Sequence, residues 1–555
     1  MKFPSSLLLI SIFLLVSCTT KPIEISGIVV DEYGVPLADA IVRIKTTENK
    51  TVSDQFGRFS IAGVLKNEAT FVTAWVSGYY INGAEYVWQG DENIEIVLHN
   101  HSDSDNPDYE WLPSLNYPGQ TEDQGCFECH SQSESDLSFP LPVDEWLQDA
   151  HSQAANNSRF ISMYLGTDLH GNKSPNTNYF FSRDYGRLPL RPNPSQPYYG
   201  PGYKLDFPKT DGNCAACHAP LAAINDPYGV DPTELEIIEK EGISCDFCHK
   251  IWDVKLNTTT MMPYPNTPGV LSYEFRRPPE GHQFFAGPLD DVAPGEDTYS
   301  PIQKTSQFCS ACHFAVFWDT PIYNSYGEWL ESPYSNQETG KTCQDCHMPP
   351  SGANQFARTD MGGEIRNPET IFSHQMPGAS NEELLQNAVN MTVDAQRYED
   401  QITVEVTITN DQTGHHVPTD SPLRHLILLI EPIDETGTLL SQISGPIIPD
   451  WGGIGNPENG YYAGLPGKTY AKILQEIWTD ISPSGAYWNP TQIISDNRLQ
   501  AFTSDISTYV FELPSEGNVS VEVKLLFRRA FLDLMNQKGW VVPDIVMETE
   551  TISFP

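Results

Sequence analysis

The chain has 555 residues, of which 73 are acidic and 32 basic, giving a formal net charge of −41. This charge excludes nucleic acid as an expected partner, because phosphate binding needs a basic surface. The length is too great for a single hydrophobic core and predicts several domains.

Residues 1–18 are typical of an export signal. The apolar run Leu7–Val16 is too short to span a membrane. Leu15-Val-Ser-Cys18 resembles the lipobox of bacterial lipoproteins, which implies that Cys18 becomes a lipidated N-terminus on an outer-membrane, cell-surface or periplasmic face. The alternative is ordinary secretion, with Cys18 lost with the signal. No other segment predicts a membrane helix, so lipid alone would provide the anchor.

Residues 22–98 predict a small β-sandwich. Runs rich in Val, Ile and Thr alternate with turn signals, among them Glu24–Val30, Ala40–Lys45 and Thr70–Trp75. A set of glycines and apolar residues resembles the carboxypeptidase regulatory-like domain; these residues are Gly27, Val29, Gly34, Pro36, Leu37, Ala40, Val42, Asp54, Gly57 and Phe59. We expect this domain to be a spacer, followed by a polar linker at His99–Asn106.

Five Cys-x-x-Cys-His motifs lie within residues 109–386. Their cysteines are Cys126 and Cys129, Cys214 and Cys217, Cys245 and Cys248, Cys309 and Cys312, and Cys343 and Cys346, and their histidines are His130, His218, His249, His313 and His347. Two thiols at this spacing can form thioethers with the two vinyl groups of one haem, and the adjoining histidine then becomes the proximal iron ligand. We therefore predict five covalent c-type haems in an irregular, partly helical domain.

Zinc is the alternative cofactor, because two Cys-x-x-Cys pairs can hold one structural zinc ion. Five pairs is an odd number, and no zinc geometry requires a histidine after each pair. The motifs and Cys18 account for all 11 cysteines, so no thiol remains for a disulfide. The second and third motifs lie 31 residues apart and the fourth and fifth 34, which favours close haem packing within each of these pairs.

A second axial ligand sets the potential of a haem iron and decides whether substrate can bind it. His151 is the strongest candidate, since it lies on an expected helix, Asp144–His151, with an apolar face. The full set of candidate distal ligands is His151, His170, His282, His374 and His415. His416 is an alternative to His415. His99, His101 and His425 are expected to be structural or exposed, and Met261, Met262, Met348 and Met376 are alternative ligands that more often pack.

Residues 387–555 return to alternating strands, including Gln401–Thr409, His425–Ile430 and Val519–Phe527. They predict a second β-sandwich. If His415 or His416 reaches the haem region, this sandwich forms a wall of the cofactor core. The expected fold is therefore multidomain, with an N-terminal β-sandwich, an irregular and α-rich five-haem domain, and a C-terminal β-sandwich packed on the haem core.

Several segments between Asp144 and the C-terminus together resemble the multihaem cytochromes of anaerobic respiration and extracellular electron transfer. They are Gly242–His249, Phe308–His313, Gly327–Tyr334, Thr342–Pro349 and Gly414–Thr419. The resemblance implies that His151 and His415 are distal ligands and that the haems are bis-histidine and low-spin. Asp420 stands where glycine often follows in that group, a departure that bears on the local turn and not on the histidine.

These observations favour an electron conduit between a membrane or periplasmic donor, such as another cytochrome or a quinol-linked protein, and an external acceptor. The alternative is a multihaem reductase or oxidase of a small nitrogen or sulfur compound, which needs one open iron position. Pentahaem cytochrome c nitrite reductase binds its catalytic haem through a motif ending in lysine, whereas every motif here ends in histidine. A filament or other homo-oligomer is a third hypothesis. The acidic surface favours basic or metal-bearing partners.

Overall fold

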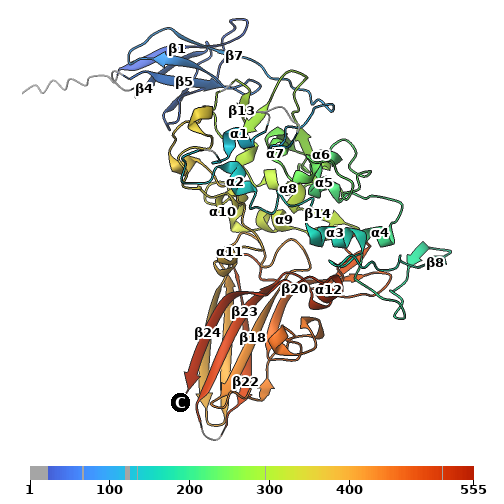
Figure 1. The fold of residues 1–555 in the computed structure, drawn as a ribbon. Coiled ribbons are helices and arrows are strands. Elements are labelled where there is room, and N and C mark those ends of the chain that lie inside the picture. The colour runs from blue at the N-terminus through green and yellow to red at the C-terminus, as the bar shows by residue number, and fades with distance from the viewer. Residues whose placement is uncertain are drawn as a thin grey trace, which may run out of the picture. The chain divides into compact units, whose positions relative to one another are not determined.

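The computed structural model describes residues 23–64, 68–118, 125–133, 135–293, 295–514 and 517–554. The predicted export signal and Cys18 lie outside these residues. The chain forms two compact units: residues up to His101 together with Asp290–Tyr299, and Ser102–Leu289 together with Ser300–Pro555 (Figure 1). Among the described helices, none is both long and apolar enough to cross a membrane.

Two sheets make up the first unit. Its strands are β1 (Glu24–Asp31), β2 (Ile41–Ile44), β3 (Lys50–Val52), β4 (Arg58–Ala62), β5 (Thr70–Trp75), β6 (Asn82–Val87) and β7 (Ile94–Leu98). The strand orders are β4-β1-β7 and β3-β2-β5-β6. Apolar residues of both sheets, including Ile25, Val42 and Val72, share one buried core, so this region is the predicted β-sandwich.

A short segment from the middle of the sequence, Asp290–Tyr299, also belongs to the first unit. Arg43 Nη2 donates to Asp290 Oδ2 at 2.9 Å, and Trp75 Nε1 donates to Thr298 Oγ1 at 2.9 Å. The sequence alone predicts that this segment belongs to the five-motif region, because nothing in its local pattern indicates an association this distant in the chain.

The five-motif region consists of short helices joined by long irregular segments. Its helices are α1 (Phe127–His130), α2 (Pro142–Trp146), α3 (Ser158–Leu165), α4 (Tyr203–Asp206), α5 (Ala215–His218), α6 (Pro220–Ala223), α7 (Cys245–Lys250), α8 (Gln307–His313), α9 (Ser325–Leu330), α10 (Cys343–His347) and α11 (Glu382–Gln386). Its short strands are β8 (Tyr179–Ser182), β9 (Gly186–Pro189), β10 (Ile251–Val254), β11 (Tyr273–Phe275), β12 (Phe285–Gly287), β14 (Ala315–Phe317) and β15 (Thr320–Tyr323), while β13 (Asp297–Tyr299) belongs to the first unit. This irregular, α-rich character is the predicted one.

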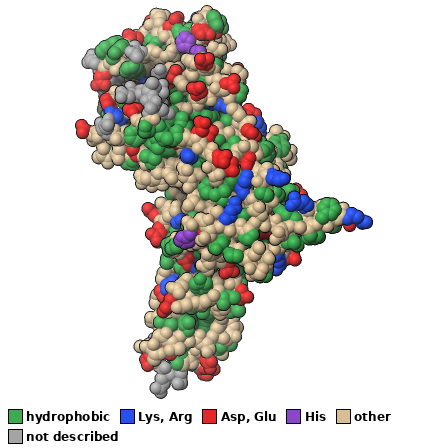
Figure 2. All heavy atoms as spheres, turned by 45° about the vertical axis from the view of Figure 1, so that its right-hand side comes forward, with side chains coloured by type: hydrophobic (Ala, Val, Ile, Leu, Met, Phe, Trp, Pro, Cys, Tyr) green, Lys and Arg blue, Asp and Glu red, His purple; other side chains and the backbone are tan. Residues whose placement is uncertain are grey.

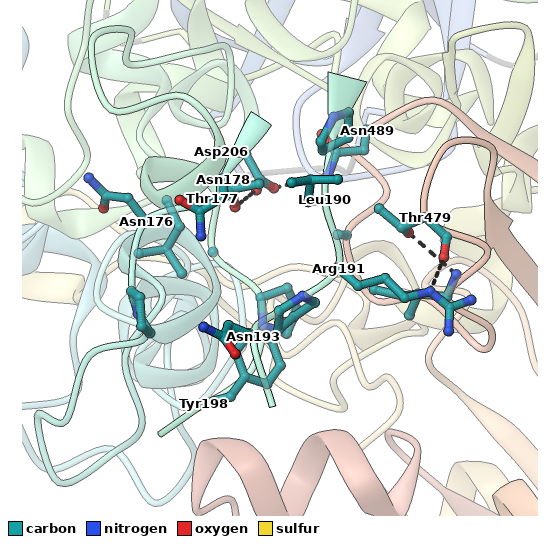
Figure 3. Close-up of a pocket in the computed structure, with 18 of the residues that line it drawn as sticks. Asn176, Thr177, Asn178, Leu190, Arg191, Asn193, Tyr198, Asp206, Thr479 and Asn489 are labelled. Carbon is teal, nitrogen blue, oxygen red and sulfur yellow. Dashed lines mark hydrogen bonds between the residues drawn. The ribbon is translucent and has the colours of Figure 1, made fainter. Parts of the chain in front are cut away.

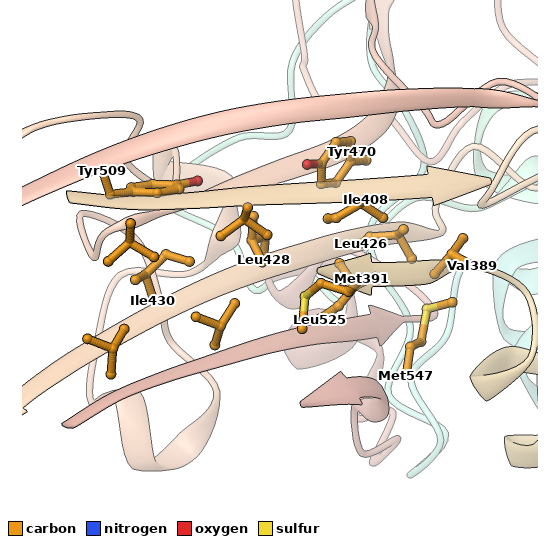
Figure 4. Packing of buried hydrophobic residues seen from close by; sticks show 14 of the residues in the cluster. Val389, Met391, Ile408, Leu426, Leu428, Ile430, Tyr470, Tyr509, Leu525 and Met547 are labelled. Carbon is orange, nitrogen blue, oxygen red and sulfur yellow. The ribbon is translucent and has the colours of Figure 1, made fainter. Parts of the chain in front are cut away.

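The C-terminal region is a β-sandwich within the second unit. Its elements are β16 (Asn390–Tyr398), β17 (Gln401–Asn410), β18 (His425–Asp434), β19 (Gln442–Ser444), β20 (Gly467–Glu476), β21 (Thr491–Asp496), β22 (Thr503–Glu512), β23 (Val519–Arg528), α12 (Leu532–Lys538) and β24 (Ile545–Phe554). The sheets run β16-β17-β22-β19 and β21-β20-β18-β23-β24. Figure 4 shows side chains of both sheets, among them Ile408, Leu428 and Met547, meeting in the core.

Polar contacts fasten this sandwich to the five-motif region. Lys472 Nζ donates to the carbonyls of Pro321 and Ile322 at 3.0 and 2.8 Å. Arg498 Nη1 donates to Glu328 Oε1 on α9 at 2.7 Å. Both cations are almost fully buried, so the junction is part of the interior and the two regions form one body.

Candidate cofactor centre

Each Cys-x-x-Cys-His motif lies on a single turn of helix, at α1, α5, α7, α8 and α10. Because residues three and four apart share a helix face, both cysteines and the histidine of a motif are presented together. Local caps fix two of these turns: Ser244 Oγ accepts from Phe247 N at 3.3 Å, and Thr342 Oγ1 accepts from Asp345 N at 3.3 Å. All ten motif cysteines are half-buried, and none of them forms a disulfide in the described residues.

All five motif histidines hold Nδ1 against an acceptor. Four Nδ1 atoms lie 2.7–3.3 Å from backbone carbonyls, those of Phe356 for His130, Ala154 for His218, Ala286 for His249 and Pro377 for His347. The fifth, on His313, lies 2.9 Å from Asp420 Oδ2. A carbonyl or carboxylate can only accept, so Nδ1 carries a proton, and in the neutral imidazole Nε2 then keeps its lone pair. This is the tautomer that a metal-ligating histidine needs.

Burial keeps most of these imidazoles neutral. It lowers the pKa of His218 to about 4, and burial together with repulsion from His415 lowers the pKa of His347 to about 4. His313 is the exception: burial opposes its charge, but the Asp420 carboxylate raises its pKa to about 9. A neutral imidazole can bind a metal without first losing a proton.

Two motif histidines face a second histidine from another part of the chain. The ring centres of His313 and His151 lie 6.2 Å apart, and those of His347 and His415 lie 6.3 Å apart. Two imidazoles bound on opposite sides of one iron would have ring centres about 6 Å apart, since metal–nitrogen bonds are about 2.0 Å and each ring centre lies about 1 Å beyond its nitrogen. Both pairs therefore fit bis-histidine ligation.

His415 and His416 diverge although they are adjacent. His415 Nδ1 lies 2.9 Å from the His416 carbonyl, which leaves its Nε2 as the available lone pair, and its ring faces His347. His416 turns toward Glu328 instead, with Nδ1 3.6 Å from Oε1. Gly414 permits this loop, since a Cβ there would lie 2.8 Å from the Tyr334 ring. The placement favours His415 over His416 as the ligand.

His374 lies near the first and third motifs. Burial lowers its pKa to about 4, and repulsion from His249 and then from His130 adds to the effect. Its Nδ1 lies 3.1 Å from the Phe372 carbonyl, so its Nε2 is also left with a lone pair. Glu145 Oε2 accepts from the His374 backbone N at 2.7 Å and fixes the segment.

His151 does not lie on the predicted helix. That helix, α2, ends at Trp146, and His151 follows in a turn. Asp149 Oδ1 accepts from His151 N at 2.8 Å and lies 2.5 Å from its Nδ1. An aspartate that binds the backbone two residues ahead competes with helical hydrogen bonds, which explains the early end. The turn also packs on Gly242, where a Cβ would lie 2.4 Å from the His151 carbonyl oxygen.

Neither His170 nor His282 is placed at a motif. The His170 ring lies beside Gly539 after α12, and His282 is exposed. In the described part of the chain, no ring contact joins either to a motif histidine. Their placement gives no support to a ligand role.

Contacts between thiols show which motifs are neighbours. The thiol of Cys126 lies against that of Cys245, the thiol of Cys217 against that of Cys312, and the thiol of Cys309 against that of Cys343. The fourth and fifth motifs are thus adjacent, as their spacing predicts. The second motif, however, makes its thiol contact with the fourth, and the third with the first. The fourth motif is the hub of this network.

The donor set does not resemble a bare-ion site. Within the described residues, no group of three or more His, Cys, Asp and Glu side chains is arranged to hold a metal ion. Paired imidazoles beside a Cys-x-x-Cys turn are instead the donor set that would hold a c-type haem. The residues present therefore fit five c-type haems.

The pocket in Figure 3 is a separate feature. It lies where the segment around Asn178–Arg191 meets the sandwich loops, and no motif residue is among the described residues that line it. Asp206 Oδ2 accepts from Asn489 Nδ2 at 2.9 Å, and Arg191 Nε donates to the Thr479 carbonyl. These bonds tie the β8–β9 region to the sandwich.

Comparison with family models and with curated proteins finds no match. Among solved structures, the chain is similar to a penta-heme cytochrome c552 from Thermochromatium tepidum, with a TM-score of 0.49 and 17% identity over 74% of this chain and 96% of that one. A type II cohesin–X-dockerin complex from Acetivibrio cellulolyticus matches with a TM-score of 0.13 and 19% identity over 14% of this chain and 58% of that one. The Fcho1 mu homology domain of Danio rerio with bound Eps15 peptide matches with a TM-score of 0.12 and 12% identity over 26% of this chain and 39% of that one.

Proposed function

We propose that this chain is an extracytoplasmic multihaem cytochrome c that conducts electrons through five covalently bound haems. The observation that carries the proposal is the common state of the eight histidines at or facing the motifs. In each, Nδ1 is held by an acceptor, so Nε2 is the ring nitrogen left free to bind a metal. Surface histidines have no reason to share this arrangement, whereas iron ligands require it.

The chain's own residues would bind and orient the haems, and the iron would supply one-electron redox chemistry. The motif cysteines fix the position of each group on its helix turn. Each histidine would hold its haem in one orientation, because a hydrogen bond at Nδ1 prevents rotation of the imidazole ring. Contacts between motif cysteines, such as that of Cys217 with Cys312, would bring the attached edges of two haems close together. Transfer between neighbours therefore needs no movement of the protein.

The test is to express the full chain in a host that attaches c-type haems and to measure its intact mass and EPR spectrum. We expect a mass increase of five haems, and low-spin ferric signals from the irons with two histidines. Serine substitution of both cysteines in one motif should remove one haem. A mature protein without added haem would overturn the proposal.

A reductase or oxidase remains the second candidate because of the surroundings of the second motif. The ring of His218 stacks on Phe160 at 3.8 Å with an angle of 3° between the planes, and no second imidazole contacts it within the described residues. Burial and then mutual repulsion lower the pKa of Arg159 and Arg529, with Arg424 as their shared neighbour. Arg529 Nε is buried with no hydrogen-bond partner among the described residues.

Such a cluster attracts an anion, which is either a haem propionate or a small anionic substrate at an open iron. EPR separates the two functions. A high-spin ferric signal that changes when a small anion is added favours the enzyme. Five low-spin signals that do not respond to the anion favour the conduit.

For a protein partner, we propose a second copy of this chain at the β8–β9 hairpin. Phe181 and Tyr185 are 79% and 70% exposed there, and the Arg183 side chain is 91% exposed. Figure 2 shows basic side chains at the projecting hairpin and acidic ones spread over the rest of the visible surface. The hairpin holds Arg183, Arg187 and Asp184, of which Asp184 pairs with Arg183 at 2.9 Å, so its net charge is positive and opposite in sign to the chain's −41.

Mass photometry at low and high salt tests this partner. We expect salt-sensitive self-association that the double substitution Phe181→Ser, Arg183→Glu abolishes. If the chain is monomeric at every salt concentration, self-association is rejected. If the wild type then binds an added acidic cytochrome and the double variant does not, the hairpin binds that partner instead.

The membrane attachment is a proposal as well. Lipidation of Cys18 would hold the protein to a membrane face, with the N-terminal sandwich as the spacer. Metabolic labelling with a fatty acid should mark the wild type and not Cys18→Ser. Equal labelling of both would reject the anchor.

A further inference from the structure

Hydrogen bonding distinguishes the fourth motif from the other four. Every Nδ1 at the other motifs, and on His374 and His415, faces a backbone carbonyl. The two imidazoles of the fourth-motif pair face carboxylates instead. Asp420 Oδ2 lies 2.9 Å from His313 Nδ1, and Asp149 Oδ1 lies 2.5 Å from His151 Nδ1.

Both carboxylates are held in place and shielded from water. The side chains of Asp149 and Asp420 are 3% and 16% exposed. Ser325 Oγ donates to Asp420 Oδ1 at 2.8 Å, and the His151 backbone N donates to Asp149 Oδ1 at 2.8 Å. Neither carboxylate can turn away from its imidazole without losing a second hydrogen bond.

The backbone at Asp420 indicates that this carboxylate is specific to its position. Its φ is +62°, in the left-handed region that glycine adopts most readily. Asp420 also stands six residues after Gly414, in the loop whose His415 faces His347. One loop thus supplies a facing histidine to the fifth motif and a carboxylate to the fourth.

We propose that Asp149 and Asp420 are positioning residues that make the fourth-motif iron the most negative in potential of the five. The proposal rests on the proposed haem function. A carboxylate that accepts from Nδ1 makes the imidazole a stronger electron donor through Nε2, which favours ferric over ferrous iron. A buried negative charge favours the more positive ferric centre as well. Both effects lower the potential, and both carboxylates act on one iron.

The fourth motif is also the hub of the thiol network, through Cys312 to Cys217 and Cys309 to Cys343. An electron that passes between the second and fifth motifs through the fourth would therefore cross the haem of lowest potential. The carboxylates would therefore control how electrons divide between the second and fifth motifs.

The experiment is a spectroscopic redox titration of the five-haem protein and of Asp420→Asn, Asp149→Asn and Asp420→Glu. Each asparagine substitution should raise the midpoint potential of one component only, and this should be the lowest component in both variants. The expected change is about tenfold in the ferric-to-ferrous ratio at a given potential, which corresponds to about 59 mV for one electron. The glutamate variant should stay near wild type, because it keeps a carboxylate.

Asp434→Asn is the matched control, since it removes a carboxylate that accepts from Thr436 N and Thr438 N in the turn after β18, outside every motif. It should leave all five midpoints in place. EPR of each variant adds a readout at the iron, because the signal of one low-spin centre alone should change. Five unchanged midpoints in both asparagine variants, or shifts in different components, would overturn the inference while the haem count leaves the proposed function standing.

Discussion

The C-terminal sandwich and the five-motif region bury their surface by different means. In the sandwich, Val404, Leu428 and Tyr509 are 0% exposed and lie in one continuous apolar cluster. In the five-motif region, the helices α1 and α10 contain no buried residue, and the His313 side chain is 41% exposed. The sandwich is complete with its own side chains, whereas the motif helices need apolar area that a bound group would supply.

Withholding haem should therefore produce the largest difference between the two regions. The full chain made without haem attachment should lose hydrogen-exchange protection in α1 and α10 by at least about 4 kcal/mol, a factor of roughly a thousand, because single helical turns are unstable alone. Strands β17, β18 and β23 should stay protected. Exchange measured by mass spectrometry on both forms gives the comparison directly.

Equal protection of the motif helices with and without haem would contradict this comparison. So would loss of protection throughout the sandwich, because its core would then depend on the haem region as much as on its own packing. The strands β1 and β5 of the N-terminal unit serve as an internal control, since that unit contains no motif.

The next prediction concerns the point at which the sandwich reaches the motif region. His415→Ala should convert one ferric centre from low-spin to high-spin, since it removes the imidazole that faces His347 at 6.3 Å. His416→Ala is the matched control at the neighbouring residue and should leave the EPR spectrum unchanged. A high-spin signal in the control, or none in His415→Ala, would reverse the assignment between these two histidines.

The sequence could predict features that depend on local patterns, and it could not predict those that depend on contacts between distant segments or on single side chains. The alternation of Ile402, Val404, Val406 and Ile408 follows from the period of a strand, and it gave β17 to within a residue. Cys-x-x-Cys-His spacing is likewise a local feature. The turn at His151 was not predictable, because it depends on the side chain of Asp149 competing with a helix. The contact of Cys126 with Cys245 depends on how distant segments pack, which no local pattern reports.

A core substitution in the sandwich should have a moderate effect. Leu428→Ala should lower the free energy of unfolding by about 2–5 kcal/mol, because it leaves a cavity among fully buried side chains. Ile506→Ala, at a site that is 60% exposed on β22, should change it by less than about 0.5 kcal/mol. Urea unfolding followed by near-ultraviolet circular dichroism measures both, and equal effects would mean that the cluster does not determine the stability of the sandwich.

The smallest expected effect is a pH dependence confined to the sandwich. Burial, followed by the nearby Arg528, lowers the pKa of His425 to about 3, against about 6.5 in the unfolded chain. The fold therefore requires the neutral imidazole: its stabilising contribution is complete above pH 6.5 and is lost as the pH falls toward 3, since the unfolded state then binds the extra proton. Between pH 6.5 and 4 the free energy of unfolding of the wild type should fall by on the order of 2–3 kcal/mol more than that of His425→Phe. Phenylalanine is chosen because its ring can keep the stack on Phe531, which lies 4.9 Å from the His425 ring. Urea unfolding at both pH values gives this difference, and because the haem ligands are the same in both proteins, their own titration cancels. Parallel pH profiles would show that His425 is protonated in the fold, and the sandwich core would then not be as dry as its packing indicates.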